Sequence, residues 1–167
     1  YVFVAHRDVG RSDARTLVAL NAVTGEVAWT LGTRVEVDRT SEDEDQSEEI
    51  RLAWDAWPLF VGDALYVTAT DLGAHPRSFI VRIDPQGGRI EWVSQIGSGL
   101  PLPFRSATRD ADSEFWVGAL PAVHTRGRLY VCDNLGSVAC IDATTGYPEW
   151  TYEYDRRLAM GEAGVSW

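Results

Sequence analysis

Three segments of this chain share one spacing: a carboxylate or amide residue, a glycine four positions later, and a tryptophan four positions after the glycine. The three copies are Asn21, Gly25 and Trp29; Asp84, Gly88 and Trp92; and Asp142, Gly146 and Trp150. The copies begin 63 and 58 residues apart. Self-similarity at a nearly fixed period indicates a repeat architecture, and it constrains the fold more than any other feature of the sequence.

The residues around each motif are typical of short strands joined by tight turns. In the third repeat we expect strands at residues 121–125, 128–132, 137–142 and 149–154. The second repeat follows the same plan, with strands expected at residues 56–60, 64–70, 79–84 and 89–95. The first repeat supplies strands at residues 1–5, 16–21 and 26–31, so its opening strand is missing. Frequent aromatic residues and turn-forming glycines agree with an all-β chain.

A four-stranded antiparallel sheet cannot bury both of its faces alone, and radial stacking of such sheets gives a β-propeller. Each tryptophan is suited to pack between adjacent sheets while its N–H reaches a backbone carbonyl. The motif glycine is expected to supply a tight turn with positive φ. The carboxylate or amide residue is expected to hydrogen-bond the backbone of that turn. All these roles are structural.

The segment from Ala19 to Trp29 (ALNAVTGEVAW) resembles the tryptophan-docking motif A-x-D-x-x-T-G-x-x-x-W of pyrroloquinoline-quinone (PQQ)-type β-propeller repeats. The third copy matches with Cys140 in place of the opening alanine, and the second departs further, with Arg82 and Gly87 in place of alanine and threonine. The resemblance implies a PQQ-like β-propeller with about three four-stranded antiparallel blades, forming part of a ring of seven or eight blades.

We expect one domain, a partial propeller over residues 1–167, with insertions at one rim. Its expected parts are an incomplete blade a (1–37), an acidic insertion (38–50), blade b (51–97), a second insertion (98–114), blade c (115–155) and the start of a further blade (156–167).

Much of the net charge of −10 lies in the acidic insertion, where residues 38–49 hold seven carboxylates against one arginine. A run of like charges with polar neighbours is typical of a solvated loop. A calcium loop is the alternative, but residues 42–49 contain no glycine for its sharp turn. The acidity and the lack of a basic stripe exclude the usual nucleic-acid-binding classes. Cys132 and Cys140 are expected out of register for a disulfide, as small strand residues.

No catalytic, cofactor-binding or metal-binding residue is predicted. The three histidines, His6, His75 and His124, are widely separated and fit no metal motif. The sequence also lacks a nucleophile elbow and a phosphate-binding glycine loop. The candidate partner contacts lie in the two insertions and are Glu42, Asp43, Glu44, Asp45, Arg105 and Arg109.

The resemblance implies two classes of function. Members of the family include scaffolds of outer-membrane protein assembly and secreted modules that bind protein partners without chemistry, and we favour this non-enzymatic class, with no cofactor. The alternatives are part of a PQQ- and calcium-dependent quinoprotein dehydrogenase, or the accessory propeller of a larger enzyme. The expected partner is another protein or the remainder of the same propeller. The resemblance implies a periplasmic or extracellular location, and the sequence contains no transmembrane run.

Overall fold

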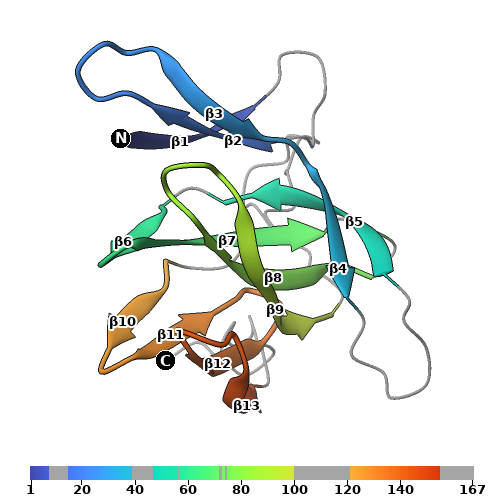
Figure 1. Ribbon diagram of the computed structural model, residues 1–167. Coiled ribbons are helices and arrows are strands. Elements are labelled where there is room, and N and C mark those ends of the chain that lie inside the picture. Colours follow the sequence, from blue (N-terminus) through green and yellow to red (C-terminus); the bar gives the residue numbers. More distant parts are fainter. Residues whose placement is uncertain are drawn as a thin grey trace, which may run out of the picture.

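The computed structural model shows three antiparallel β-sheets stacked face to face (Figure 1). It describes residues 1–7, 15–38, 47–55, 57–71, 73, 75–99 and 121–154. All regular structure within these ranges is strand, as the sequence predicts. No helix in the described part of the chain is long and apolar enough to cross a membrane.

The first sheet has three strands in the order β1-β2-β3. Their bounds are β1 Val2–Arg7, β2 Arg15–Leu20 and β3 Val27–Leu31. No described strand pairs with the other edge of β1.

The middle sheet has six strands, with β4-β5-β7-β8-β9 in order and β6 paired to β7. Their bounds are β4 Arg34–Asp38, β5 Ser47–Trp54, β6 Leu59–Val61, β7 Ala64–Asp71, β8 Arg77–Ile83 and β9 Ile90–Ser98. β5 and β6 pair with opposite halves of the same edge of β7, so together they form an interrupted inner strand.

The middle sheet corrects two sequence-based expectations. The strand expected at residues 56–60 begins only at Leu59, because Trp57 has a φ of 86°, which a β-strand cannot accommodate. The ends of the acidic segment 38–50 lie in strands β4 and β5, which pair from Asp38 opposite Ser47 to Arg34 opposite Arg51. A β-hairpin therefore flanks residues 39–46, where a loop was expected throughout.

The third sheet is a four-stranded meander in the order β10-β11-β12-β13. Its bounds are β10 Val123–Thr125, β11 Arg128–Cys132, β12 Ser137–Asp142 and β13 Pro148–Glu153. β11 and β12 match the ranges predicted from the turns on either side. Cys132 and Cys140 are both free thiols, with Cys132 opposite Val138 and Cys140 opposite Tyr130.

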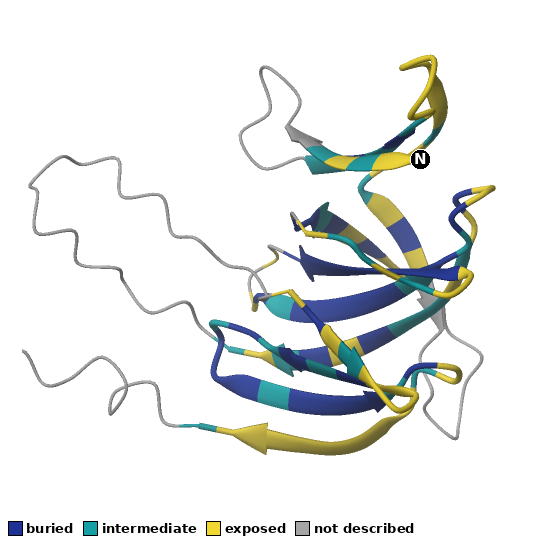
Figure 2. Cartoon of the chain, turned by 90° about the vertical axis from the view of Figure 1, so that its left-hand side faces the viewer, coloured by how far each residue is buried: buried dark blue, intermediate teal, exposed yellow. Residues whose placement is uncertain are grey.

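The middle sheet is buried on both faces, and every residue of β7 is buried (Figure 2). Residues such as Leu65, Val67 and Val81 face the first sheet and pack with Leu17 of that sheet and with Trp54 of their own. The opposite face carries Tyr66 and Ile80, which pack against Leu129 and Ile141 of the third sheet. Alternation along each strand thus supplies two separate cores, one at each junction between sheets.

The three sheets also repeat the same internal register. On three neighbouring strands, Ala19 lies between Phe3 and Trp29, Arg82 between Tyr66 and Trp92, and Cys140 between Tyr130 and Trp150. In each sheet the register then shifts by one residue directly after Ala19, Arg82 or Cys140. Each sheet is therefore one blade of a β-propeller, built to a common plan.

We expect Tyr66→Phe to lower the free energy of unfolding by about 1 kcal/mol, because the Tyr66 hydroxyl donates a 2.9 Å hydrogen bond to the carbonyl of Ala143 in the next blade. The hydroxyl is desolvated, and this burial raises the pKa of Tyr66. Urea unfolding measures the loss. Tyr130→Phe, at the equivalent position of the last blade, is the matched control and should change stability little. Equal losses in the two variants would contradict the assignment.

Candidate functional site

The first contact between blades joins Trp29 to the turn of the second motif. A Cβ atom built on Gly88 would lie 2.8 Å from Cδ2 of the Trp29 indole, closer than real Cβ atoms approach other atoms. The indole Nε1–H donates a 2.9 Å hydrogen bond to the carbonyl of Pro85 in the same turn. Only glycine at position 88 leaves room for the ring, and its φ of 71° also favours glycine.

The second contact repeats the first one blade further on. The Trp92 indole lies against Gly146, where a Cβ atom would come within 2.6 Å of its Cδ2. Its Nε1–H donates a 3.1 Å hydrogen bond to the carbonyl of Thr144. Each junction between blades thus contains one indole, one bare glycine and one indole-to-carbonyl hydrogen bond.

Among the described residues, the tryptophan of the third motif packs on no glycine turn, and the glycine of the first motif has no indole against it. Trp150 is 46% exposed. Gly25 has the same positive φ, 75°, but nothing lies within 4 Å of a Cβ built there. The two halves of one further contact therefore lie at opposite ends of the stack.

The motif's carboxylate or amide residues organise their own turns. Asn21 Oδ1 accepts hydrogen bonds from the backbone N–H groups of Val23 and Thr24 at 2.9 and 3.2 Å. Asp84 and Asp142 accept equivalent bonds from the residues two and three positions later. In each copy the N–H of the motif glycine also donates to the backbone carbonyl of the same carboxylate or amide residue.

The third copy holds its carboxylate most tightly. The pKa of Asp142 is lowered from its ordinary value, first by the backbone N–H of Thr145 and then by the Thr145 hydroxyl, which donates to the same oxygen at 2.9 Å. These donors favour the ionised form. The charge of Asp142 is thus used to fix a turn.

An aromatic residue on the second strand of each blade packs against the tryptophan. The pairs are Phe3 with Trp29 at 5.7 Å between ring centroids, Tyr66 with Trp92 at 5.9 Å, and Tyr130 with Trp150 at 6.2 Å. Sequence reasoning missed these partners. The signal that could have found them is the aromatic at a fixed position in the Y-V-F-V, A-L-Y-V and R-L-Y-V strands.

Arg82 explains why the second copy departs from the motif. Its Nε lies 2.7 Å from Glu91 Oε2, and its Nη1 donates a 3.1 Å hydrogen bond to the carbonyl of Thr144 in the next blade. That carbonyl is the one to which Trp92 donates. The arginine therefore adds a polar contact across the junction where the other copies have a small residue.

A second polar contact crosses the same junction at the other end of the strands. Asp133 is 2% exposed and accepts hydrogen bonds from the N–H groups of Leu135 and Ser137 at 3.0 and 2.7 Å. The Ser78 hydroxyl of the middle blade donates to its other oxygen. A Cβ on Gly97 would lie 2.1 Å from Ser137 Oγ, so glycine is required here too. Because these partners lie far apart in sequence, no local pattern indicates the contact.

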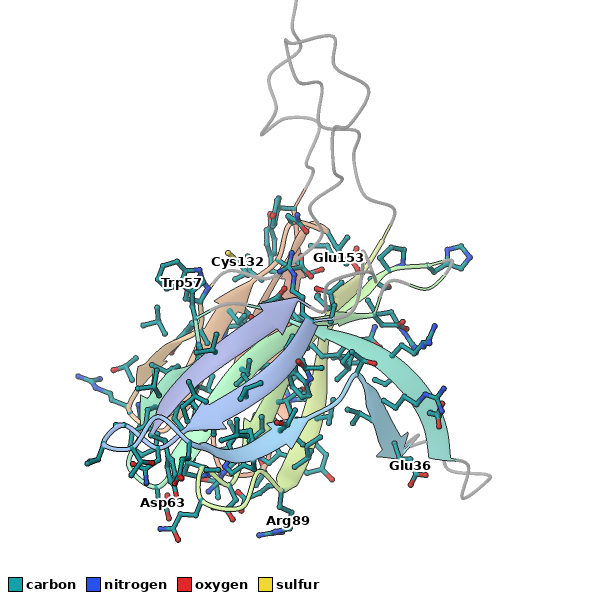
Figure 3. The ribbon with its side chains drawn as sticks, turned by 90° about the horizontal axis from the view of Figure 1, so that it is seen from above. Glu36, Trp57, Asp63, Arg89, Cys132 and Glu153 are labelled. Atoms are coloured by element: carbon teal, nitrogen blue, oxygen red, sulfur yellow. The ribbon has the colours of Figure 1, made fainter. Side chains whose placement is uncertain are left out.

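The strand ends form two distinct rims. The turn rim carries the three motif turns and the turn at Gly62, and Asp63 and Arg89 lie there (Figure 3). At the loop rim, β1, β7 and β9 end, and Cys132 and Glu153 lie at that end in Figure 3. Arg77 and Asp71 form a 2.7 Å ion pair at the loop rim.

The candidate partner contacts lie outside the described residues. They are Glu42, Asp43, Glu44, Asp45, Arg105 and Arg109. Arg105 and Arg109 lie in the connection from β9 to β10, which leaves from the loop rim. The other four lie in the connection from β4 to β5, a hairpin that projects away from that rim at Glu36 in Figure 3.

The described carboxylates do not fit a calcium site of the quinoprotein kind. No group of three or more histidine, cysteine, aspartate or glutamate side chains within the described ranges could hold a metal ion. The motif residues Asp84 and Asp142 already accept hydrogen bonds from their own turns. These hydrogen bonds tie both carboxylates to the repeated framework of turns.

Trp92→Ala should cost about 3–5 kcal/mol of unfolding free energy, because it empties the junction between two blades. Trp150→Ala is the matched control, and it should cost about 1 kcal/mol or less, since its ring is 46% exposed. Denaturant unfolding followed by circular dichroism measures both. Similar losses would show that the tryptophans stabilise their own blades and not the junctions.

The lowered pKa of Asp142 predicts that its turn is stable at neutral pH and loses stability as the pH falls through the folded-state pKa. Thr145→Val removes the hydroxyl donor and should move the pKa upward toward its ordinary value. Carboxyl chemical shifts in an NMR titration report this change. Thr151→Val, an exposed substitution on β13, should leave the Asp142 pKa unchanged. An unchanged pKa in Thr145→Val would contradict the role of the hydroxyl.

Comparison with known proteins places these features in a family. The family described as outer membrane protein assembly factor BamB matches residues 1–114 and 76–160 of the chain. A search of curated proteins gives no match.

Among solved structures, BamB from Moraxella catarrhalis is similar in fold, with a TM-score of 0.50 and 16% sequence identity. The similarity covers 85% of this chain and 38% of that one, so the chain spans well under half of the BamB structure. The fold is that of a β-propeller of the PQQ-like type, of which about three blades are present. The chain belongs to the family of the outer membrane protein assembly factor BamB.

Proposed function

We propose that this chain is a non-catalytic part of a β-propeller that acts as an interaction scaffold and binds protein partners through its loop rim. Membership of the BamB family supports the scaffold role. The partner would be a protein of the outer-membrane assembly type, and the location would be the periplasm or the cell exterior. These two points rest on the resemblance to the family alone.

The asymmetry between the two rims is the observation that supports this proposal most directly. The turn rim is closed by tight turns such as 62–63 and 126–127. The connections 8–14 and 100–120 join strand ends at the loop rim, and the β4–β5 hairpin leaves the middle blade at the same rim, where Leu52 pairs with Asp71. Repeat proteins place insertions on one face, and that face often carries binding.

The framework beneath the loop rim suits this role because it is held rigidly. Asp71 pairs with Arg77, whose guanidinium also lies 5.6 Å from the centre of the Phe79 ring. Ser78 and Asp133 link the middle and last blades at the same end. Loops anchored on such a framework lose less conformational freedom when a partner binds.

The candidate contacts in the two long insertions have opposite charges and would therefore recognise different surfaces. The acidic residues Glu42, Asp43, Glu44 and Asp45 favour a basic surface of the partner, whereas Arg105 and Arg109 favour an acidic one. A partner with both kinds of charge would be held in one orientation.

The test uses the immobilised chain and an envelope extract from the source cells. The acidic variant replaces Glu42, Asp43, Glu44 and Asp45 by their amides, and the control variant carries Asp63→Ala and Arg89→Ala at the turn rim. We expect the acidic variant to retain at least about tenfold less of the bound partner, because charged contacts are lost, while the control retains it fully.

Equal retention by both variants would overturn the loop-rim assignment. Separately, PQQ and calcium are added to the chain, and the quinone absorbance is followed through gel filtration. Stoichiometric retention of the quinone with dye-linked oxidation of alcohols or sugars would replace the scaffold proposal with a quinoprotein dehydrogenase.

A further inference from the structure

The hairpin formed by β4 and β5 extends beyond the blade to which it belongs. Only the end of β5, residues 52–54, pairs with β7, whereas residues 47–51 pair with β4 alone among the described strands. Glu36 lies on this hairpin, which projects away from the stacked blades (Figure 3). The hairpin lies between the first and second blades in the chain and not at either end of the stack.

Strand β4 presents an edge with which no described strand pairs. The Leu52 N–H donates a 2.6 Å hydrogen bond to the Thr33 carbonyl, so alternation along an antiparallel ladder directs the backbone groups of Val35 to β5. The backbone N–H and C=O groups of Arg34 and Glu36 then point to the other edge. Proteins often protect such an edge with a proline or a β-bulge, but β4 has no proline and its register with β5 runs without a shift. This edge is therefore suited to pair with a further strand.

The charged face of the hairpin places like charges opposite one another. Arg34 and Glu36 are exposed, on the face opposite to Val35, which packs in the core. Arg34 lies opposite Arg51 and Glu36 lies opposite Glu49, and like charges directly across two strands are destabilising. The diagonal ion pair from Arg34 Nε to Glu49 Oε1, at 3.8 Å, offsets little of this, because both side chains are more than half exposed. A strand that carries the opposite charges at these positions would therefore stabilise β4.

A second β4 has this pattern when it runs antiparallel to the first. With Val35 of the two copies at a two-fold axis, Arg34 of each copy lies opposite Glu36 of the other, and the outward backbone groups of both strands meet. The acidic end of each strand, at Asp38, then lies beside the end of the other strand that begins at Arg34. The alternative centred on Glu36 would set two glutamates against each other. Charge therefore selects one register.

We propose that a second copy of this chain pairs with the open edge of β4, strand to strand and antiparallel, through Arg34 and Glu36. The occupant is argued from the charge complementarity of this strand with itself. The proposal goes beyond the loop-rim function proposed above and does not depend on it. The interface is isologous, since the same strand is used on both copies, so association stops at a dimer.

The dimer is expected to be weak, because one strand pair is a small interface and each copy has a formal net charge of −10. At a salt concentration of about 0.15 M, charges more than about 8 Å apart are largely screened, so the contact itself decides association. Sedimentation equilibrium at this salt concentration should show a mass that rises from one copy to two, with a Kd of about 10–100 µM. A mass of one copy up to about 500 µM would overturn the proposal, and growth beyond two copies would overturn the closed pairing.

Charge reversal tests the register. Arg34→Glu gives β4 two glutamates and Glu36→Arg gives it two arginines, so each variant alone should associate about tenfold more weakly than the unmodified chain. An equimolar mixture of the two variants restores opposite charges at both positions and should form a 1:1 dimer. The double variant, Arg34→Glu with Glu36→Arg, is self-complementary and should recover dimerisation. A mixture that associates no better than the separate variants would contradict this register.

A proline tests the pairing of the backbones. Glu36→Pro removes an N–H that points to the open edge and leaves the ladder between β4 and β5 intact, because proline is tolerated on an edge strand with this orientation. Glu36→Gln is the matched control, since it loses the same charge and keeps the N–H. The proline variant should associate several-fold more weakly than the glutamine variant. Equal association of the two would show that the backbones do not pair.

A second control separates this contact from a general effect of charge. Arg89→Glu reverses an arginine at the turn rim whose side chain is 72% exposed, close to the 69% of Arg34. This variant should dimerise as the unmodified chain does. Circular dichroism should show that every variant is folded. If Arg89→Glu weakened association as much as Arg34→Glu, net charge and not β4 would control it, and the proposal would be wrong.

Discussion

The contact of an indole with a bare glycine turn is the interaction on which the rest of this structure depends. A tryptophan ring can lie flat on a backbone turn only where no Cβ atom intervenes, and at Gly88 and Gly146 that atom would come within 3 Å of the ring. The ring then buries apolar surface from two blades at once, and its N–H keeps a partner. Each copy of the motif therefore needs both a tryptophan and a glycine, because the tryptophan of one copy packs on the glycine of the next. Their repeated occurrence in the sequence reflects this contact between sheets.

Local signals made much of the fold predictable from the sequence. Strands β11 and β12 have the predicted bounds because tight turns at Gly127 and Gly136 define where they begin, and both glycines have positive φ. The middle blade was harder, since its inner strand is broken at Trp57 by a backbone conformation that no local pattern indicates. The hairpin of β4 and β5 was also missed, because the acidic composition of the segment between them favours a loop.

Contacts that join blades depend on partners far apart in the sequence, and this limited what could be predicted of the site. The bond from Ser78 to Asp133 and the bond from Tyr66 to Ala143 connect residues 55 and 77 positions apart. Arg82 is instructive, because its departure from the motif looks like decay of the repeat. In the structure it supplies an ion pair with Glu91 and a hydrogen bond to Thr144. A weaker match to a repeat motif can thus mark a junction with an added polar contact.

The hydrogen bonds made by the polar residues of the motif also bear on their role. Asn21, Asp84 and Asp142 are the most regular polar residues in the chain, yet each one accepts hydrogen bonds from the backbone of its own turn. The lowered pKa of Asp142 has this cause, so it reports a structural task and not a catalytic one. In Asp142 all three of these hydrogen bonds end on Oδ1, so the turn is fixed by a single carboxylate oxygen.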